Sequence, residues 1–396
     1  KNVKLKERKI KIQYLNQFKN SSDFKIAWSI EENNNKIQEG QFENELLNPN
    51  ETKFFKIPYK KFQRKQGNSY VLKVNFNEFK KSKIGFRFLY KGESQWVLSS
   101  DFPLNKSDDS DLKFSESDSV FQIATKNCNY TISKTNGLLT SLGQPNTSFL
   151  KSELEPYFWR ASTDSDLRNG FSADRIMWKN AFKSFNLNSC SVKSKSNTEV
   201  IIITKGILQL KENVGLNIEY KISLKEGISI NATLDMSQVN SMPEPIRFGF
   251  KALTNPSFGK IAFFGKGPQE TYCDRSSSAT FGLFEFPIRD LFIQQIRPQE
   301  QGNRTDINWM TLRSFEEKKY TIRKISETPL QITVLPFDYN ELDGVYARGN
   351  DINIGKYNSI IICEKLAGLG NGQFPPSSKY RLLDKQLNCR FQIYFE

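Results

Sequence analysis

Two acidic residues, Asp164 and Asp166, lie close together in the segment FWRASTDSD, which covers residues 158–166. Two carboxylates on opposite sides of a glycosidic bond can cleave it, one as an acid and the other as a base or nucleophile. The same segment carries Arg160, whose guanidinium can pair with either acid. A structural ion pair is therefore favoured over a catalytic pair.

Two loops could contact a ligand. The first, LRNGFSADR at residues 167–175, follows the acidic pair and contains Gly170 as a possible hinge. The second, GLGNGQFPPSS at residues 368–378, has glycines that allow a backbone to approach a ligand, and Phe374 could offer its ring to a sugar. A plain turn between strands is the alternative for the second loop. It lacks the Lys-Ser or Lys-Thr pair of a phosphate-binding loop.

The stretch from Phe264 to Leu312 combines turn-forming residues with many aromatic side chains. Gly265, Gly267 and Pro268 predict a sharp turn. Because buried charges usually satisfy one another, an ordered structural loop is the favoured interpretation. The charged side chains that could pair with one another and fix this turn are Glu270, Asp274, Arg275, Glu300, Arg304 and Asp306.

The sequence contains no histidine, which excludes a Ser-His-Asp triad, a Cys-His pair and any histidine-ligated metal. Its five cysteines are spread without a CxxC pattern, so neither a zinc site nor a disulfide framework is predicted. We expect these sulfurs to be buried and unreactive. No metal and no cofactor are therefore predicted.

The formal net charge of +14 is concentrated in residues 1–107, which hold 22 Lys and Arg against 11 Asp and Glu. A cluster at Lys60, Lys61, Arg64 and Lys65 could face an acidic partner, but a lysine-rich solvated surface is favoured. No nucleic-acid-binding motif accompanies it, and no run of 18 apolar residues occurs. We expect a soluble globular protein that binds neither nucleic acid nor membrane. Its opening, KNVKLKERK, suggests a fragment or a processed product.

Short strands with period-two alternation dominate the sequence. The first hundred residues predict a small antiparallel sandwich of about seven strands, for example at Phe24–Ile30, Tyr70–Phe76 and Ile84–Phe88. A polar segment rich in Ser and Asp follows it, and then many more strands. Helical periodicity is confined to Ala173–Ser184 and Tyr339–Tyr346, which is too little for an α/β barrel. The predicted divisions are a small sandwich at 1–107, a linker at 108–118 and one very large sandwich at 119–396.

Four segments occur in the order FWRASTDSD, RIMWKNAF, GKGPQETYCDR and RPQEQGNRTDINW. They resemble the C-terminal domain of lacZ-type β-galactosidases of glycoside hydrolase family 2. Residues 9–42 resemble the immunoglobulin-like domain that precedes it in those enzymes, so the resemblance covers essentially the whole chain. It implies an all-β fold, with a small immunoglobulin-like sandwich followed by a large galactose-mutarotase-like super-sandwich.

In that family the two catalytic glutamates and the metal sites lie on an upstream (β/α)8 barrel. The resemblance implies that this region supplies a mobile loop, here residues 167–175 with Gly170 and Arg175, and an aromatic platform under the galactose, here Phe374. The platform is typically a tryptophan, and the family motif has a proline and an asparagine where this chain has Ser162 and Ser165.

We therefore expect the non-catalytic C-terminal portion of a β-galactosidase, either a small subunit or a fragment, which completes the galactoside site of a barrel-bearing partner chain. The alternative is a galactosidase-derived carbohydrate-binding or structural module, without enzyme activity, among other subunits of a larger assembly.

Overall fold

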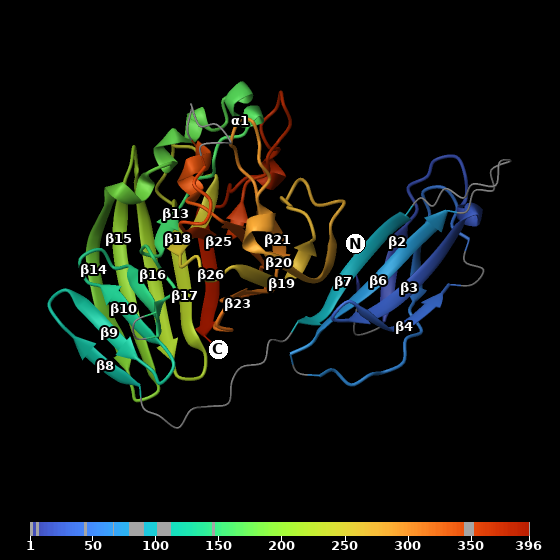
Figure 1. Cartoon of the computed structure of the whole chain (residues 1–396). Coiled ribbons are helices and arrows are strands. Elements are labelled where there is room, and N and C mark those ends of the chain that lie inside the picture. Colours follow the sequence, from blue (N-terminus) through green and yellow to red (C-terminus); the bar gives the residue numbers. More distant parts are fainter. Residues whose placement is uncertain are drawn as a thin grey trace. The chain divides into compact units, whose positions relative to one another are not determined.

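A computed structural model describes residues 3–4, 8–42, 46–65, 67–78, 91–100, 112–144, 147–343 and 352–395. The chain divides into two compact units, which Figure 1 draws from blue to red along the sequence. The small unit comprises residues 1–103 with 280–283, and the large unit comprises residues 104–279 with 284–396. Both are built almost entirely from antiparallel strands, which confirms the predicted all-β fold class.

The small unit is a sandwich of two sheets that share one apolar core. Alternation explains the core, because Ile26, Trp28 and Ile30 all point from one strand into it. The strand predicted at Ile84–Phe88 lies outside the described residues. One sheet has the order β1 (Val3–Lys4), β2 (Lys9–Gln13), β5 (Thr52–Lys56), and the other has the order β4 (Asn35–Gln41), β3 (Phe24–Glu32), β6 (Ser69–Glu78), β7 (Lys91–Ser100). A 3-10 turn, η2, covers Ser21–Asp23.

The large unit contains a nine-stranded sheet and two five-stranded sheets around one continuous core. The nine-stranded sheet has the order β14 (Phe185–Lys195), β15 (Glu199–Gln209), β16 (Asn213–Ser223), β17 (Gly227–Asp235), β26 (Gln386–Phe395), β23 (Lys319–Lys324), β22 (Trp309–Arg313), β19 (Lys260–Gly267), β20 (Thr280–Pro287). One five-stranded sheet has the order β13 (Glu155–Tyr157), β18 (Arg247–Thr254), β25 (Asn358–Leu366), β24 (Leu330–Leu335), β21 (Asn303–Ile307). The other has the order β12 (Thr147–Ser148), β11 (Leu139–Gln144), β10 (Asn129–Ser133), β9 (Val120–Ala124), β8 (Lys113–Glu116).

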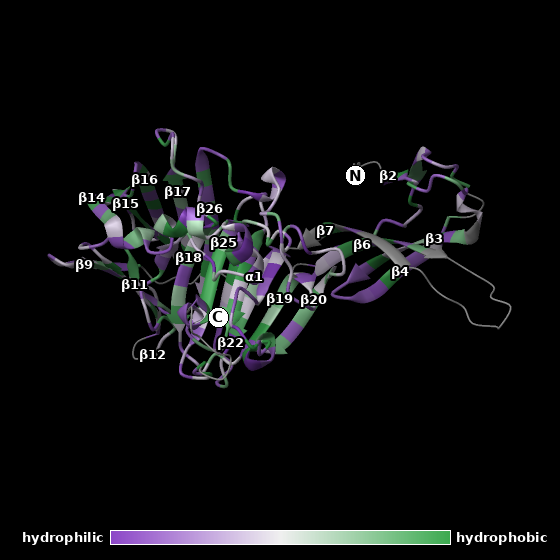
Figure 2. Cartoon of the chain, turned by 90° about the horizontal axis from the view of Figure 1, so that it is seen from above, coloured by the Kyte–Doolittle hydropathy of each residue, from purple (hydrophilic) through white to green (hydrophobic). Residues whose placement is uncertain are grey.

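The core of the large unit follows the alternation of its strands. Along β15 and β16 every second side chain is buried, whereas β25 is buried at nearly every position, as in a strand that is covered on both faces. Figure 2 shows the consequence, with β25 coloured as one of the most apolar strands. This large sandwich confirms the predicted architecture.

Helical structure is scarce among the described residues, and apart from η2 it lies in the large unit, mostly toward the end where Figure 1 labels α1. The helix predicted at Ala173–Ser184 is instead two 3-10 turns, and only the first half of the one predicted at Tyr339–Tyr346 is described. The helical elements of this unit are α1 (Asp164–Asn169), η3 (Ala173–Trp178), η4 (Ala181–Ser184), η5 (Ile288–Leu291), η6 (Tyr339–Asp343) and η8 (Ser378–Tyr380). None of the helices in the described part of the chain has the length and apolar character needed to cross a membrane.

Two segments differ from the sequence interpretation. Residues 108–111 of the predicted linker lie outside the described residues, but Lys113–Glu116 form strand β8. Its polar sequence suits the edge of a sheet, where only Phe114 is half-buried and stacks on Phe121 at 6.1 Å. The turn-rich stretch from Phe264 to Leu312 also contains β20, β21 and most of β22. Several of its aromatic residues lie within these strands, and others lie in the turns between them.

Candidate functional site

Helix α1 begins at a capping box. The hydroxyl of Thr163 accepts a hydrogen bond from the backbone N–H of Asp166 at 3.1 Å, and the Asp166 carboxylate accepts one from the backbone N–H of Thr163 at 3.0 Å. The helix ends at Gly170, whose φ of +79° is a left-handed conformation that glycine adopts without strain. The sequence TDSDLRNG therefore specifies a short helix with a fixed start and end.

The Asp166 carboxylate is fully buried and paired with an equally buried Arg160, at 2.7 Å between Nη2 and Oδ1. Asp164, in contrast, is 70% exposed and forms an ion pair of 2.9 Å with Arg297. The two acids thus have separate cationic partners, which agrees with the structural interpretation of this segment. They do not form a catalytic pair of free carboxylates.

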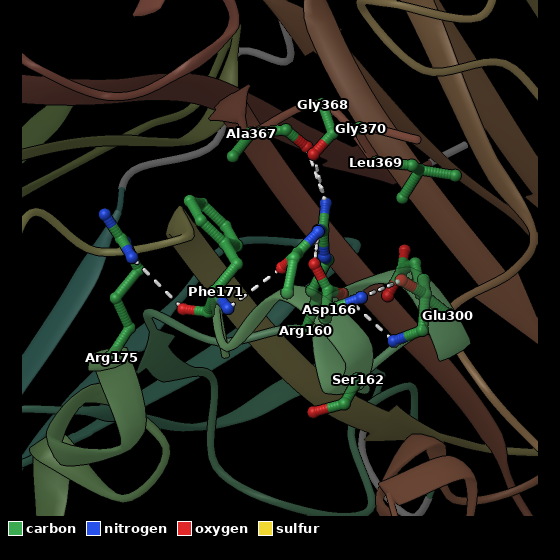
Figure 3. Close-up of polar contacts among 12 residues, drawn as sticks. Arg160, Ser162, Asp166, Phe171, Arg175, Glu300, Ala367, Gly368, Leu369 and Gly370 are labelled. Atoms are coloured by element: carbon green, nitrogen blue, oxygen red, sulfur yellow. Dashed lines mark hydrogen bonds and ion pairs between the residues drawn. The ribbon is translucent and has the colours of Figure 1, made fainter. Parts of the chain in front are cut away.

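A second group of contacts holds the loop formed by residues 368–377, which we call the platform loop. Arg160 donates from Nη1 to the carbonyl oxygens of Ala367 and Gly368, each at 2.8 Å, and Figure 3 shows these bonds above α1. The Asp274 carboxylate accepts the next two backbone N–H groups, those of Leu369 at 3.0 Å and Gly370 at 2.9 Å. Charged side chains therefore satisfy successive peptide groups where the loop leaves β25.

The platform loop then folds back on itself. Arg275 donates to the Gly370 carbonyl oxygen at 2.9 Å, and Asn371 and Phe374 exchange two backbone hydrogen bonds of 3.1 Å. The Asn371 side chain also accepts from the Phe374 N–H at 3.0 Å. This tight turn leaves Phe374 64% exposed, so the predicted platform residue is available to a ligand or a partner.

Arg175 lies in a different environment from Phe374. Its guanidinium is buried, donates to the Phe171 carbonyl oxygen at 3.1 Å and lies 4.0 Å from the Phe171 ring centroid. It also pairs with Glu244 at 3.0 Å, and Arg381 donates two hydrogen bonds of 2.6 and 3.0 Å to the same carboxylate. Arg175 therefore holds the segment after α1 in place, and a contact with substrate stays a prediction for it, as for Gly170 and Phe374.

The pKa of Glu244 reflects this pairing. Burial alone would raise it, but the hydrogen bond from Arg381 and the charge of Arg175 outweigh burial and lower the pKa below its usual value. Sequence reasoning missed Glu244 and Arg381, because residues so far apart along the chain give no local signal. The Pro-Glu-Pro sequence in MPEPIRFGF predicts a turn, but it does not indicate which residues pair with the glutamate.

A buried polar cluster lies behind the site. Arg247 and Glu300, neither of them exposed, pair at 3.1 Å, and the hydroxyls of Tyr339 and Tyr272 donate to the same Glu300 carboxylate. Burial raises the pKa of Glu300, while Arg247 and the Tyr339 hydroxyl act in the opposite direction. The Tyr339 hydroxyl also accepts the backbone N–H of Ala161 at 3.0 Å, which connects this cluster to the FWRASTDSD segment.

The turn at Gly265–Arg275 is fixed largely as its charges suggested. Glu270 accepts the backbone N–H of Gly302 at 2.6 Å, and Arg304 donates to the Gly302 carbonyl oxygen at 2.8 Å. Asp274 and Arg275 hold the platform loop, Glu300 binds Arg247, and Asp306 pairs with Lys266 at 3.0 Å. These charged groups therefore hold loops in place as predicted, but the contacts of the described residues join them to backbone groups and to residues outside the set of six, and do not pair them with one another.

An open pocket of about 370 Å³ lies beside α1. Beside it the Asp343 carboxylate accepts a hydrogen bond from Trp159 Nε1 at 2.8 Å and forms an ion pair with Lys179 Nζ at 2.7 Å. Leu167 and Ile176 are each more than half exposed, so much of the wall is apolar. The lining residues are Trp159, Ser162, Leu167, Ser172, Ala173, Ile176, Lys179, Arg297, Pro298, Leu342 and Asp343.

The cysteines are less uniformly buried than expected. Cys128, Cys363 and Cys389 are buried, whereas Cys190 and Cys273 are only half-buried, and all five are free thiols. Within the described residues, no three His, Cys, Asp or Glu side chains gather as ligands of a metal ion.

The fold and this end of the large unit define a two-unit, all-β protein whose loops are held by buried ion pairs. Residues 124–394 match the family described as β-galactosidase small chain, and residues 10–83 match the family described as β-galactosidase domain 4. The chain therefore belongs to the β-galactosidase small-chain family.

Similar proteins include a β-galactosidase from Priestia megaterium, 24% identical over 343 residues, which cover 85% of this chain and 32% of that one. A β-galactosidase from Lactobacillus delbrueckii subsp. bulgaricus is 29% identical over 231 residues, covering 57% of this chain and 22% of that one. The chain thus spans a third or less of the length of these relatives. A solved galactose 1-epimerase from Lactobacillus acidophilus aligns over 72% of this chain and 98% of that chain, with a TM-score of 0.37 and 9% identity.

Proposed function

We propose that this chain is the non-catalytic C-terminal portion of a β-galactosidase and completes the galactoside site of a barrel-bearing chain. The observation that carries the proposal is the pair of family matches, which together span most of residues 10–394. The two relatives described above are about three and more than four times as long as their aligned parts, and this leaves room in them for a catalytic domain.

The geometry supports a role in substrate binding without catalysis. Asp164 and Asp166 are engaged by arginines, as are Glu244 and Glu300, so none of these acids is free to act on a glycosidic bond. Phe374, in contrast, presents its ring on a loop that is held at several peptide groups. An exposed ring on a fixed loop can stack under the apolar face of a sugar.

The test compares the purified chain with its native complex. The tagged chain is isolated with its partners, and hydrolysis of a chromogenic β-galactoside is measured for the complex, for the separated chains and after recombination. We expect hydrolysis by the complex, none by this chain alone, and recovery on recombination with a barrel-bearing chain. Hydrolysis by this chain alone at the rate of the complex would refute the proposal.

A second candidate is a galactosidase-derived carbohydrate-binding or structural module without enzyme activity. It is favoured by the smaller aromatic side chain at the platform position, Phe374, and by the departures at Ser162 and Ser165. In that case the isolated assembly would contain no barrel-bearing chain and would hydrolyse no galactoside, while this chain stayed folded within it.

A further inference from the structure

Arg160 bonds to two segments that are about 200 residues apart in the chain. Its Nη2 binds the Asp166 carboxylate in the first turn of α1, and its Nη1 binds the carbonyl oxygens of Ala367 and Gly368. All three distances lie between 2.7 and 2.8 Å, and the Arg160 side chain is fully buried. The two ends of one guanidinium thus connect the helix to the start of the platform loop (Figure 3).

Only a planar, multi-donor group can make this connection. A guanidinium presents five donors in a fixed fork, whereas a lysine ammonium is a point charge on a flexible stem. The orientation of the fork depends on Asp166, whose carboxylate holds Nη2 and at the same time caps α1 through the Thr163 backbone. Loss of the Asp166 charge would therefore leave the Arg160 charge buried without its carboxylate and free the fork to turn.

The path continues from Gly368 to the exposed aromatic ring. Gly370 has a φ of +68°, and a Cβ there would lie 2.7 Å from the Phe374 carbonyl oxygen, so the turn carrying Phe374 packs directly on Gly370. Asn371 holds Phe374 by its backbone and its side chain. A displacement of residues 367–370 would therefore be passed on to Phe374.

We propose that Arg160 is a positioning residue for Phe374. Through the Arg160–Asp166 pair, the platform loop is ordered only when α1 is formed. The consequence for binding rests on the proposed function: a galactoside meets a correctly placed Phe374 ring only while α1 is formed. Residues 167–175 come directly after Asp166 in the chain, so a change in their conformation would alter the position of Phe374 through Asp166 and Arg160. Asp166 itself has no hydrogen bond to the platform loop among the described residues.

The coupling is tested on the full chain by amide hydrogen exchange, without any partner. In Asp166→Asn, exchange at Leu369, Gly370 and Phe374 should rise about ten-fold or more, because their hydrogen bonds would open more often. Arg160→Lys should act in the same way. If either variant fails to fold, the other still decides. Unchanged exchange at these three amides in a folded Asp166→Asn chain would overturn the proposal.

Arg323→Lys is the control. Arg323 is also largely buried and donates from β23 to the side chain of Gln392 on β26, and it contacts neither α1 nor the platform loop through the hydrogen bonds of the described residues. Exchange at Leu369 and Gly370 should stay as in the unchanged chain. A rise equal to that in Arg160→Lys would show general loosening and contradict a specific coupling.

The role in binding is tested in the native complex with a chromogenic galactoside. Phe374→Ala and Arg160→Lys should each raise KM about ten-fold with kcat changed less than about two-fold, and the double variant should resemble Phe374→Ala alone. Multiplied effects would overturn the positioning role. If no complex hydrolyses galactoside while the exchange result holds, the proposed function fails and the coupling of loop and helix stands.

Discussion

Arg247 donates a hydrogen bond to Glu300 at 3.1 Å, and neither side chain has any exposed surface. Removing the Glu300 charge would leave a buried guanidinium without its carboxylate, which typically costs about 3–5 kcal/mol. We expect Glu300→Gln to lower the free energy of unfolding of the large unit by that amount, as measured by urea denaturation.

A matched surface change is the control for that measurement. Glu316 pairs with Lys318 at 2.8 Å, but its side chain is 74% exposed. Exposed ion pairs contribute little to stability because water screens them, so Glu316→Gln should leave the unfolding curve nearly unchanged. If the two variants unfold at the same urea concentration, the buried pair is not the stabilising contact described above.

The pairing of Glu244 with Arg175 and Arg381 predicts a pH dependence of stability. Because the pKa of Glu244 is lowered in the folded chain, the unfolded chain takes up a proton at this carboxyl first as the pH falls. The stabilisation is therefore complete above the ordinary glutamate pKa and is lost below it. The difference in unfolding free energy between the unchanged chain and Glu244→Gln should stay constant from about pH 7 to about pH 5 and narrow as the pH falls below the ordinary glutamate value of 4.5. A difference that stayed constant down to about pH 3 would contradict this prediction.

The half-buried and buried thiols should be slow to react. Burial raises the pKa of Cys273 to about 11 and that of Cys128 and Cys363 to about 12, so little thiolate is present near neutral pH. For Cys273 the thiolate fraction near neutral pH falls about 100-fold relative to a free cysteine with a pKa of 9.0. A thiol reagent should label the folded chain far more slowly than the urea-unfolded chain, and mass spectrometry of the labelled peptides checks this site by site. Rapid labelling of Cys273 in the folded chain would show that its surroundings are more open.

Gly170 and Gly370 should respond differently to alanine, although both have positive φ. A Cβ at Gly170 would meet nothing within 4 Å, so Gly170→Ala should cost only the backbone strain of about 1–2 kcal/mol. At Gly370 the Cβ would also lie 2.7 Å from the Phe374 carbonyl oxygen, so Gly370→Ala must move the turn. Amide exchange at Phe374 should rise more in Gly370→Ala than in Gly170→Ala, because the strain at Gly170 reaches the turn indirectly, through α1 and the Arg160–Asp166 pair. Equal exchange in the two variants would contradict the packing of this turn.

Alternation in the sequence was enough to predict most of the large strands, because a half-buried strand repeats its apolar residues with period two. The nearness of Arg160 in the sequence also favoured a structural role for Asp166, since the two residues are only six positions apart. The partners of Glu244 are 69 and 137 residues away, and no local period carries that information. Strand β8 was missed for the opposite reason, because an edge strand buries too little to leave an apolar pattern.

The position of β26 has a consequence for biosynthesis. Among the described strands this one has the highest residue numbers, yet it lies between β17 and β23 and connects the two halves of the nine-stranded sheet. A ribosome must therefore synthesise the chain beyond residue 395 before those halves can join, and until then each presents an unpaired edge. We expect the large unit to complete its folding only after β26 has left the ribosome. During translation the exposed edges of β17 and β23 can pair with other chains unless another molecule covers them.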